Sequence, residues 1–499
     1  MLHQQIGYIQ AQGVCLPRSL AKRRRARCSL SSDQDPAWCA DRRGEGSHIS
    51  FNAGIENKPE AAAVLLPDTR RKLLWMVVVA LALRLTVMAF VYPERTDPAR
   101  DHWRCGGEAG RIARAIVEGK GFSNPLFGDT GPTSWLAPVF PYLLAGIFRV
   151  FGVYTVTSTI VALSLDCLFS ALTCIPVFLI AKKCFGERTG LWAGWGWALF
   201  PYAIYFSADF IWHTALSTLL LTLIFLSALR LECSRGAGAW ILFGSLSGLG
   251  ALTDPIVMSV APFLGAWALW RRYEKRRPWF APGFAAVLAL TLVVSPWFVR
   301  NYLTFHKVIP FRSCLGLELY CGNNADTWHW GPPGYHPSDN EKEWQEYQQL
   351  KEIGYTEKKM REGLAFIRSH RLLYLKQSLR RVVYFWTGFW SFSRRYLAEE
   401  PADPGNMALS TAMTILAFAG LRRAFRLKLP VAMPFLLVFL FFPITYYLTH
   451  PEDYYRRPID PLFVVLAAFA ITSWRSATQQ KTAPRVPTDT ASGEYEPSS

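Results

Sequence analysis

One carboxylate, Glu108, stands at the start of a short amphipathic stretch and is followed by a second, more apolar stretch from Val139 to Phe151. The second stretch suits a helix lying in a membrane interface. A carboxylate ahead of such a helix is well placed to act on a lipid-borne phosphate. Glu108 would also be favoured at a helix start by the helix dipole and by an ion pair with Arg111. These residues alone therefore leave a catalytic and a structural role open.

Potential metal ligands gather in one short polar segment near the end of the chain. His450, Glu452 and Asp453 could act together with His102, but no fixed ligand spacing supports a metal site. The chain also lacks a phosphate-binding Gly-Lys-Ser/Thr loop and a dinucleotide fingerprint. The sequence therefore argues against ATP-driven transport and against chemistry on soluble nucleotides.

A membrane-embedded scaffold must position these side chains. The chain has 499 residues, of which 51% are hydrophobic and only 18% charged, whereas soluble proteins carry about a quarter charged residues. Its apolar runs approach the roughly 20 residues that cross a bilayer. The runs are Leu73–Tyr92, Ser158–Ala181, Leu191–Ala208, Ile211–Leu231, Trp240–Thr253, Pro255–Trp270, Trp279–Phe298, Met407–Leu421, Leu429–Leu448 and Pro461–Trp474. We therefore predict an all-α polytopic membrane protein with about ten spans. The two spans around Asp254-Pro255 could instead form one broken helix.

The distribution of basic residues predicts the orientation of these spans, because lysine and arginine in short loops stay on the cytoplasmic side. Arg70, Arg71 and Lys72 precede the first span, and every second loop after it is basic. Both termini are therefore expected in the cytoplasm, with the protein in the inner (plasma) membrane. The net charge of +17 follows from this topology. It needs no nucleic-acid partner, and no folded basic domain is apparent.

The same topology divides the chain into five parts. They are a disordered cytoplasmic segment 1–72, a transmembrane core 73–298 with a first outside loop 93–157, a mostly helical outside segment 299–406, transmembrane helices 407–474, and a disordered cytoplasmic tail 475–499. Helices are predicted outside the core spans at 108–118, 139–151, 341–350 and 357–369, and 382–390 is expected to dip into the interface. The first outside loop, the segment 299–406 and the polar segment 449–458 all fall on one side. Function is therefore expected there.

Four polar residues fall inside predicted spans: Arg84, Asp166, His213 and Asp254. Such residues are costly in lipid and usually face the protein interior. We expect structural pairing for them. A secondary transporter or lipid flippase that uses Arg84, Asp166 and Asp254 is the alternative, although no inverted repeat supports it.

Three stretches of the first outside loop carry a resemblance to a known family. Residues 108–116 (EAGRIARAI), 119–122 (GKGF) and 131–141 (GPTSWLAPVFP) resemble this loop in bacterial GT-C glycosyltransferases. The similarity is closest to the family 39-like branch, which includes dolichyl-phosphate-mannose protein mannosyltransferases and the lipid A aminoarabinose transferase. Pro296–Tyr302, followed by Gly322-Asn323-Asn324, resembles a second stretch of these proteins. The resemblance covers most of residues 73–474 and rests on order and topology.

This resemblance implies a hexosyl- or pentosyltransferase that takes its sugar from a polyprenyl-phosphate donor and passes it to a lipid, glycan or protein acceptor outside the cytoplasm. An acidic residue of the first outside loop then acts as general base, which contributes typically about 10²–10⁴-fold. Glu108 matches that position best. The loop lacks the adjacent Asp-Glu pair of many members and has Gly106-Gly107-Glu108 instead, so Asp101 and Asp97 are rival bases.

The resemblance also implies a leaving phosphate, whose oxygens arginine can bind bidentately. Arg456 and Arg457 are the leading candidates, followed by Arg300 and Arg111. Anchoring of a span end at the interface is the alternative role for these arginines. Divalent ions assist some GT-C enzymes and not others, so the cofactor stays open and the sequence requires no metal.

Overall fold

A computed structural model describes residues 67–95, 106–234, 236–325, 335–390, 403–452 and 454–482, together with 392, 394 and 397. Within these ranges the chain is helical, and its only β pairing is an isolated bridge between Ser123 and Pro132. The all-α prediction is confirmed. The predicted disordered segment falls outside the described residues up to position 66, and the predicted tail does so from position 483 onward.

The helices of the described residues follow one another along the chain in a fixed order. They are α1 (Pro67–Arg95), α2 (Gly107–Val117), α3 (Val139–Phe151), α4 (Val156–Leu172), α5 (Cys174–Phe185), α6 (Glu187–Ala198), α7 (Pro201–Asp209), α8 (Thr214–Leu231), α9 (Gly238–Thr253), the 3-10 turn η2 (Pro255–Ser259), α10 (Ala261–Glu274), α11 (Phe280–Phe305), α12 (Leu315–Gly322), α13 (Glu341–Ser369), α14 (Arg371–Thr387), α16 (Asp403–Arg426), α17 (Ala432–Phe441), α18 (Ile444–Leu448), the 3-10 turn η3 (Arg457–Ile459) and α19 (Asp460–Thr482).

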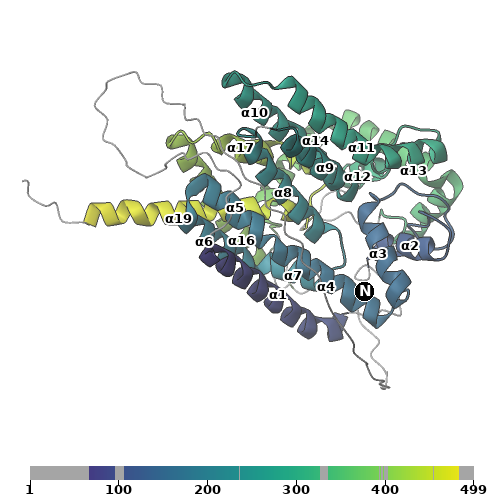
Figure 1. Cartoon of the computed structure of the whole chain (residues 1–499). Coiled ribbons are helices and arrows are strands. Elements are labelled where there is room, and N and C mark those ends of the chain that lie inside the picture. Colours follow the sequence, from purple (N-terminus) through teal and green to yellow (C-terminus); the bar gives the residue numbers. More distant parts are fainter. Residues whose placement is uncertain are drawn as a thin grey trace, which may run out of the picture. The chain divides into compact units, whose positions relative to one another are not determined.

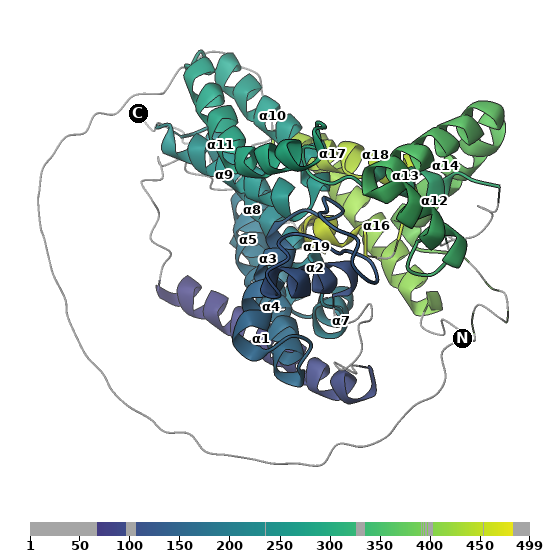
Figure 2. The same cartoon turned by 90° about the vertical axis from the view of Figure 1, so that its right-hand side faces the viewer.

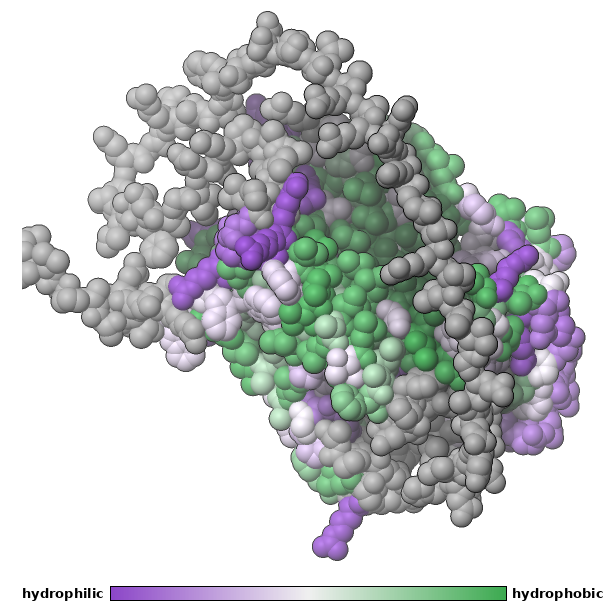
Figure 3. Space-filling view, turned by 60° about the horizontal axis from the view of Figure 1, so that its bottom comes forward, coloured by the Kyte–Doolittle hydropathy of each residue, from purple (hydrophilic) through white to green (hydrophobic). Residues whose placement is uncertain are grey.

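Six helical stretches of the described chain are long and apolar enough to cross a membrane. They are residues 68–90, 156–185, 214–231, 280–305, 403–426 and 457–474, and shorter apolar helices cover 139–151, 238–253 and 432–448. Each predicted span coincides with a helix or with two consecutive helices. The predicted break at Asp254-Pro255 is confirmed, because α9 ends at Thr253 and Asp254 is extended with φ −149°. A wide hydrophobic surface runs across the middle of the face in Figure 3, with hydrophilic residues gathered towards its ends.

The predicted span Leu191–Ala208 is interrupted between α6 and α7, and a buried arginine stabilises the break. Pro201 begins α7, so the chain cannot continue the α6 hydrogen-bond pattern there. Arg84 of α1 donates to the buried carbonyl oxygens of Ala198 at 3.0 Å and Trp197 at 3.3 Å, and to Ser170 Oγ at 2.9 Å. These contacts confirm the structural pairing predicted for Arg84.

Glycines allow several of the spans to approach closely. A Cβ atom at Gly244 of α9 would overlap the carbonyl oxygen of Ala286 in α11, and one at Gly420 of α16 would overlap that of Leu466 in α19. Small residues at helix contacts are typical of membrane bundles, where close van der Waals packing drives helix association. The bundle therefore depends on glycine at these two crossings.

The helices predicted for the outside segments are present at one end of the bundle. Helices α2 and α3 lie near α12 and α13, on the right in Figure 1 and towards the viewer in Figure 2. Two helices were predicted at 341–350 and 357–369, and α13 covers both with a kink at Lys351, where φ is 57°. The polar segments that sequence analysis assigned to one side thus meet there.

Candidate functional site

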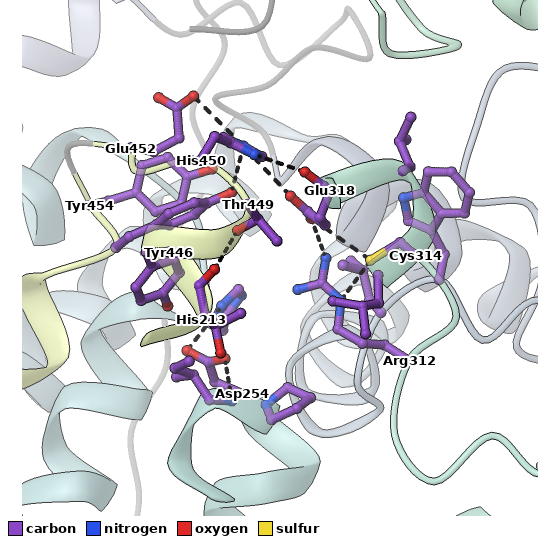
Figure 4. Close-up of a pocket in the computed structure, with 18 of the residues that line it drawn as sticks. His213, Asp254, Arg312, Cys314, Glu318, Tyr446, Thr449, His450, Glu452 and Tyr454 are labelled. Atoms are coloured by element: carbon purple, nitrogen blue, oxygen red, sulfur yellow. Dashed lines mark hydrogen bonds and ion pairs between the residues drawn. The ribbon is translucent and has the colours of Figure 1, made fainter. Parts of the chain in front are cut away.

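A cavity of about 690 Å³ opens where these polar segments meet. The first outside loop, the connection from α11 to α12, and the residues after α18 all contribute to its wall. Its acidic, basic and histidine lining residues are Glu108, His213, Asp254, Arg312, Glu318, His336, Asp339, His450 and Glu452. Figure 4 shows Arg312, Cys314 and Glu318 on one side of the cavity, facing Tyr446, Tyr454 and His450. Aromatic and apolar walls with a few convergent polar groups are typical of a binding site.

Glu108 is buried at the start of α2, with its carboxylate in the cavity wall. Trp135 Nε1 donates to Glu108 Oε1 at 2.9 Å, and His336 Nε2 lies 2.9 Å from the same oxygen. Gly106 and Gly107, with φ of 95° and 46°, form the turn that brings the chain into α2. The left-handed backbone there is one that residues with a side chain rarely adopt. The local sequence thus places the Glu108 carboxylate in the cavity wall, where Trp135 and His336 hold it.

The two partners of Glu108 also adjust its proton affinity. Burial alone would raise the pKa of Glu108, but the hydrogen bond and positive charge of His336, together with the Trp135 indole, lower it below its ordinary value. Burial likewise opposes the charge on His336, yet the contact with Glu108 raises the pKa of that imidazole. Glu108 is therefore ionised at neutral pH, the state that a general base requires.

The carboxylate–imidazole pair gives a pH prediction. His336→Gln keeps a hydrogen-bond donor beside Glu108 but removes the positive charge, and His336→Ala removes both. Because burial raises the pKa of Glu108 and His336 lowers it, each variant should have a Glu108 pKa above that of the wild type. If Glu108 must be ionised for turnover, the acidic limb of the kcat profile moves to higher pH, further in His336→Ala than in His336→Gln. Turnover measured across pH for the three proteins checks this. If the acidic limbs of the three kcat profiles were identical, His336 would not control the ionisation on which turnover depends.

Arg312 carries a fixed positive charge into the same cavity. Among the described residues that line the cavity, it is the only arginine or lysine. Arg312 Nη2 donates to Glu318 Oε1 at 2.8 Å and Nε donates to Cys314 Sγ at 2.7 Å. A guanidinium has five N–H donors, so these two contacts leave others for an anionic ligand. Sequence analysis did not identify Arg312 or His336; their only signal was a place in the polar stretch after the Pro296–Tyr302 motif.

The two leading predicted phosphate ligands are not part of the cavity wall. Arg456 Nε lies 3.0 Å from Asp460 Oδ1, and Arg457 Nη1 lies 2.9 Å from Asp460 Oδ2. All three side chains are buried, and the Arg457 guanidinium stacks 3.4 Å over the ring of Tyr202. Neither arginine lines the cavity. Their contacts stabilise the start of α19 against α7.

Asp460 gives a stability prediction that is separate from any chemistry. Asp460→Asn removes the negative charge that two buried arginines share, and breaking a buried ion pair costs about 3–5 kcal/mol. Unfolding of the purified protein in detergent should therefore shift to clearly lower temperature or denaturant concentration. Unchanged stability would contradict the structural role that we assign to the Arg456–Asp460–Arg457 group.

The other two predicted phosphate ligands hold the first outside loop. Arg300 Nη1 donates to the Thr133 carbonyl oxygen at 2.6 Å and Nη2 to that of Phe122 at 2.8 Å. Arg111 Nη1 lies 3.3 Å from the Pro125 carbonyl oxygen and from Ser338 Oγ. Neither lines the cavity. None of the four predicted arginines thus lines the cavity, whereas Arg312 does.

Asp101 and Asp97, the rival bases, lie outside the described residues, as do His102 and Asp453. His450 Nε2 is 3.5 Å from Glu318 Oε2 and 4.0 Å from Glu452 Oε1. In the described part of the chain, no group of three or more His, Cys, Asp or Glu is arranged to hold a metal ion.

A second imidazole–carboxylate pair also lines the cavity. His213 Nε2 lies 3.7 Å from Asp254 Oδ2, as Figure 4 shows, so the pairing predicted for these two span residues is present. Asp166 is buried in α4, and its carboxylate accepts no side-chain hydrogen bond from the described residues. Pairing is therefore not seen for Asp166.

Comparison with known proteins finds one family match over part of the chain and solved structures with a similar fold. Residues 135–299 match the family described as dolichyl-phosphate-mannose-protein mannosyltransferase, so the predicted resemblance is confirmed over this segment, which includes neither Glu108 nor Arg312. No curated protein matches the chain. The apo oligosaccharyltransferase of Archaeoglobus fulgidus matches with a TM-score of 0.50 and 13% identity, over 83% of this chain and 52% of that one. The two chains therefore share a fold.

Two further solved structures are similar. ArnT from Cupriavidus metallidurans bound to undecaprenyl phosphate has a TM-score of 0.44 and 15% identity, over 82% of this chain and 61% of that chain. The Archaeoglobus fulgidus oligosaccharyltransferase AglB in complex with an inhibitory peptide and a dolichol-phosphate has a TM-score of 0.49 and 16% identity. The match covers 84% of this chain and 53% of that chain. The chain spans about half the length of the archaeal oligosaccharyltransferases that it matches.

Proposed function

We propose that this chain, a multi-pass membrane protein with a mannosyltransferase-family segment, is a glycosyltransferase. It would move a sugar from a polyprenyl-phosphate donor to a lipid, glycan or protein acceptor. One observation carries the proposal: Glu108 and Arg312, which are far apart in the sequence, line one cavity of about 690 Å³. A proton acceptor and an anion ligand around one cavity are the two groups that transfer from a sugar phosphate needs.

The reaction that fits this geometry is a direct displacement at the anomeric carbon. The acceptor oxygen or nitrogen forms a bond to that carbon, and Glu108 takes the proton of the attacking group. The bond between the anomeric carbon and the phosphate oxygen breaks, and the oxygen keeps the electron pair. Arg312 stabilises the negative charge of the departing polyprenyl phosphate. A single displacement inverts the anomeric configuration, so an inverted product is expected.

The remaining lining residues would orient these two groups. His336 and Trp135 hold Glu108 through its Oε1 atom, and Glu318 fixes Arg312 from one side. Asp101 stays a second candidate for the base. We assign the donor phosphate to Arg312 and not to the four arginines predicted from sequence, because none of those four lines the cavity.

We also propose the orientation predicted from the basic loops, with both termini in the cytoplasm, the protein in the inner membrane, and the cavity on the outer face. A donor panel tests the activity. Purified protein in lipid nanodiscs is given polyprenyl phosphates carrying labelled hexoses or pentoses, with lipid, glycan and peptide acceptors. Transfer or donor hydrolysis supports the proposal. No turnover of any donor, together with substrate-dependent ion or lipid movement in vesicles, would favour the transporter alternative.

A further inference from the structure

Glu352 is a buried carboxylate in α13 that contacts both polar segments of the cavity without lining the cavity itself. Its Oε1 atom accepts hydrogen bonds from the Ser134 backbone N–H at 2.8 Å and from Ser313 Oγ at 2.7 Å. Its Oε2 atom accepts from Thr133 Oγ1. Only 4% of the residue is exposed. A buried carboxylate that satisfies several donors fixes their relative positions, because leaving any donor unpaired is costly.

Of the three residues that Glu352 holds, Ser134 and Ser313 are each next in sequence to a residue of the proposed site. Ser134 precedes Trp135, whose indole donates to Glu108. Ser313 follows Arg312, and the Ser313 backbone N–H donates to the Ser134 carbonyl oxygen at 2.8 Å. One carboxylate therefore connects the segment that orients the proposed base to the segment that carries the proposed phosphate ligand.

The backbone of α13 is bent at the residue before Glu352. Lys351 has φ 57°, a left-handed conformation that is unfavourable for a residue with a Cβ atom. Such a conformation persists where surrounding contacts determine it, and it is frequent at functional sites. Before the bend, the ring of Tyr347 packs edge-on against Trp135, with centroids 5.9 Å apart. Both halves of α13 therefore reach the same short piece of the first outside loop.

We propose that Glu352 is the positioning residue that holds the Trp135–Glu108 and Arg312 sides of the cavity in register, an inference that rests on the proposed glycosyltransferase function. Helix α13 would thus support catalysis by positioning the reacting groups, without contacting the substrate itself. Removing the Glu352 charge should loosen both loops, turn Trp135 away from Glu108, and separate the base from the donor phosphate. Misplacement of reacting groups by about 1 Å can cost about 100-fold in rate.

The test compares Glu352→Gln with Glu343→Gln in the full-length protein. Glu343 is a matched control, because it is equally buried on α13 but accepts from Tyr355 and pairs with Lys359 instead of contacting either loop. Hydrogen–deuterium exchange is followed in peptides covering 131–137 and 310–316. Turnover is followed as kcat and KM across pH. Ser313→Ala, which removes one donor, is the milder variant should Glu352→Gln fold poorly.

The proposal predicts faster exchange in both peptides for Glu352→Gln, kcat lower by about 10- to 100-fold, and an acidic limb of the kcat profile moved to higher pH. Ser313→Ala should change the same quantities less, and Glu343→Gln should leave the pH limb in place. Unchanged exchange in both loops would overturn the positioning role. Faster exchange with unaltered kcat and pH limb would overturn the link to catalysis. Faster exchange in a protein whose wild type turns over no donor would instead contradict the proposed function alone.

Discussion

Glu108→Gln is expected to lower kcat for glycosyl transfer by about 10²–10⁴-fold, the usual contribution of a positioned general base. Glutamine keeps the size and hydrogen-bonding capacity of the side chain but cannot take the acceptor proton. Donor affinity should change little, because we assign the phosphate contacts to Arg312. Turnover at saturating donor, together with binding of unlabelled polyprenyl phosphate, separates these two effects.

Glu118→Gln is the matched control for this variant. Glu118 follows the same helix α2 but is exposed and pairs with Lys120 at 3.1 Å, so its replacement should leave kcat near the wild-type value. Full activity of Glu108→Gln would move the base to Asp101 or Asp97. Loss of donor binding in Glu108→Gln would show instead that Glu108 organises the cavity and does not act on the acceptor.

Arg312→Gln is the second substitution with a large expected effect. Hydrogen bonds to charged groups are worth about 1.5–3 kcal/mol each, so losing one such bond to the donor phosphate weakens binding by about 10- to 100-fold. The dissociation constant for polyprenyl phosphate and KM for the donor should both rise. Arg312→Lys should recover only part of the affinity, because lysine keeps the charge but not the bidentate geometry.

Arg149→Gln provides the control, since Arg149 is an exposed residue of α3 and its loss should leave donor affinity unchanged. Arg111→Gln discriminates between the two assignments of the phosphate site. Arg111 contacts loop groups and an aromatic ring, so its loss should affect the donor dissociation constant less than the loss of Arg312. If Arg111→Gln raised the donor dissociation constant more than Arg312→Gln did, Arg111, the ligand predicted from sequence, would be the phosphate ligand instead.

The sequence predicted those features that depend on local pattern. The bounds of α3 coincide with the predicted stretch Val139–Phe151, because its apolar residues recur with helical period between two breakers, Pro138 and Gly152. The break at Asp254-Pro255 followed from the restriction that proline places on the residue before it. Glu108 was predicted as the base because it begins an amphipathic stretch, which is helix α2 in the structure, and because the resemblance to GT-C glycosyltransferases places an acidic residue in this loop.

The arginine ligand could not be predicted, because its position depends on contacts between distant segments. Arg312 follows a span end in the same way as Arg300, and only the folded chain shows which of them faces the cavity. Arg456 and Arg457 looked available because they stand in a polar loop. Their spacing from Asp460, four and three residues, places all three on one helical turn. That pairing is a signal in the sequence that pointed to a structural role.

The most direct test of the central claim is a cryo-EM structure of Glu108→Gln in nanodiscs with an intact polyprenyl-phosphate sugar, because this variant should bind the donor without consuming it. We expect phosphate oxygens at about 3 Å from Arg312 nitrogen atoms, with the sugar lying between Arg312 and position 108. A donor phosphate bound at Arg456 and Arg457, or a cavity that stays empty at saturating donor, would contradict it.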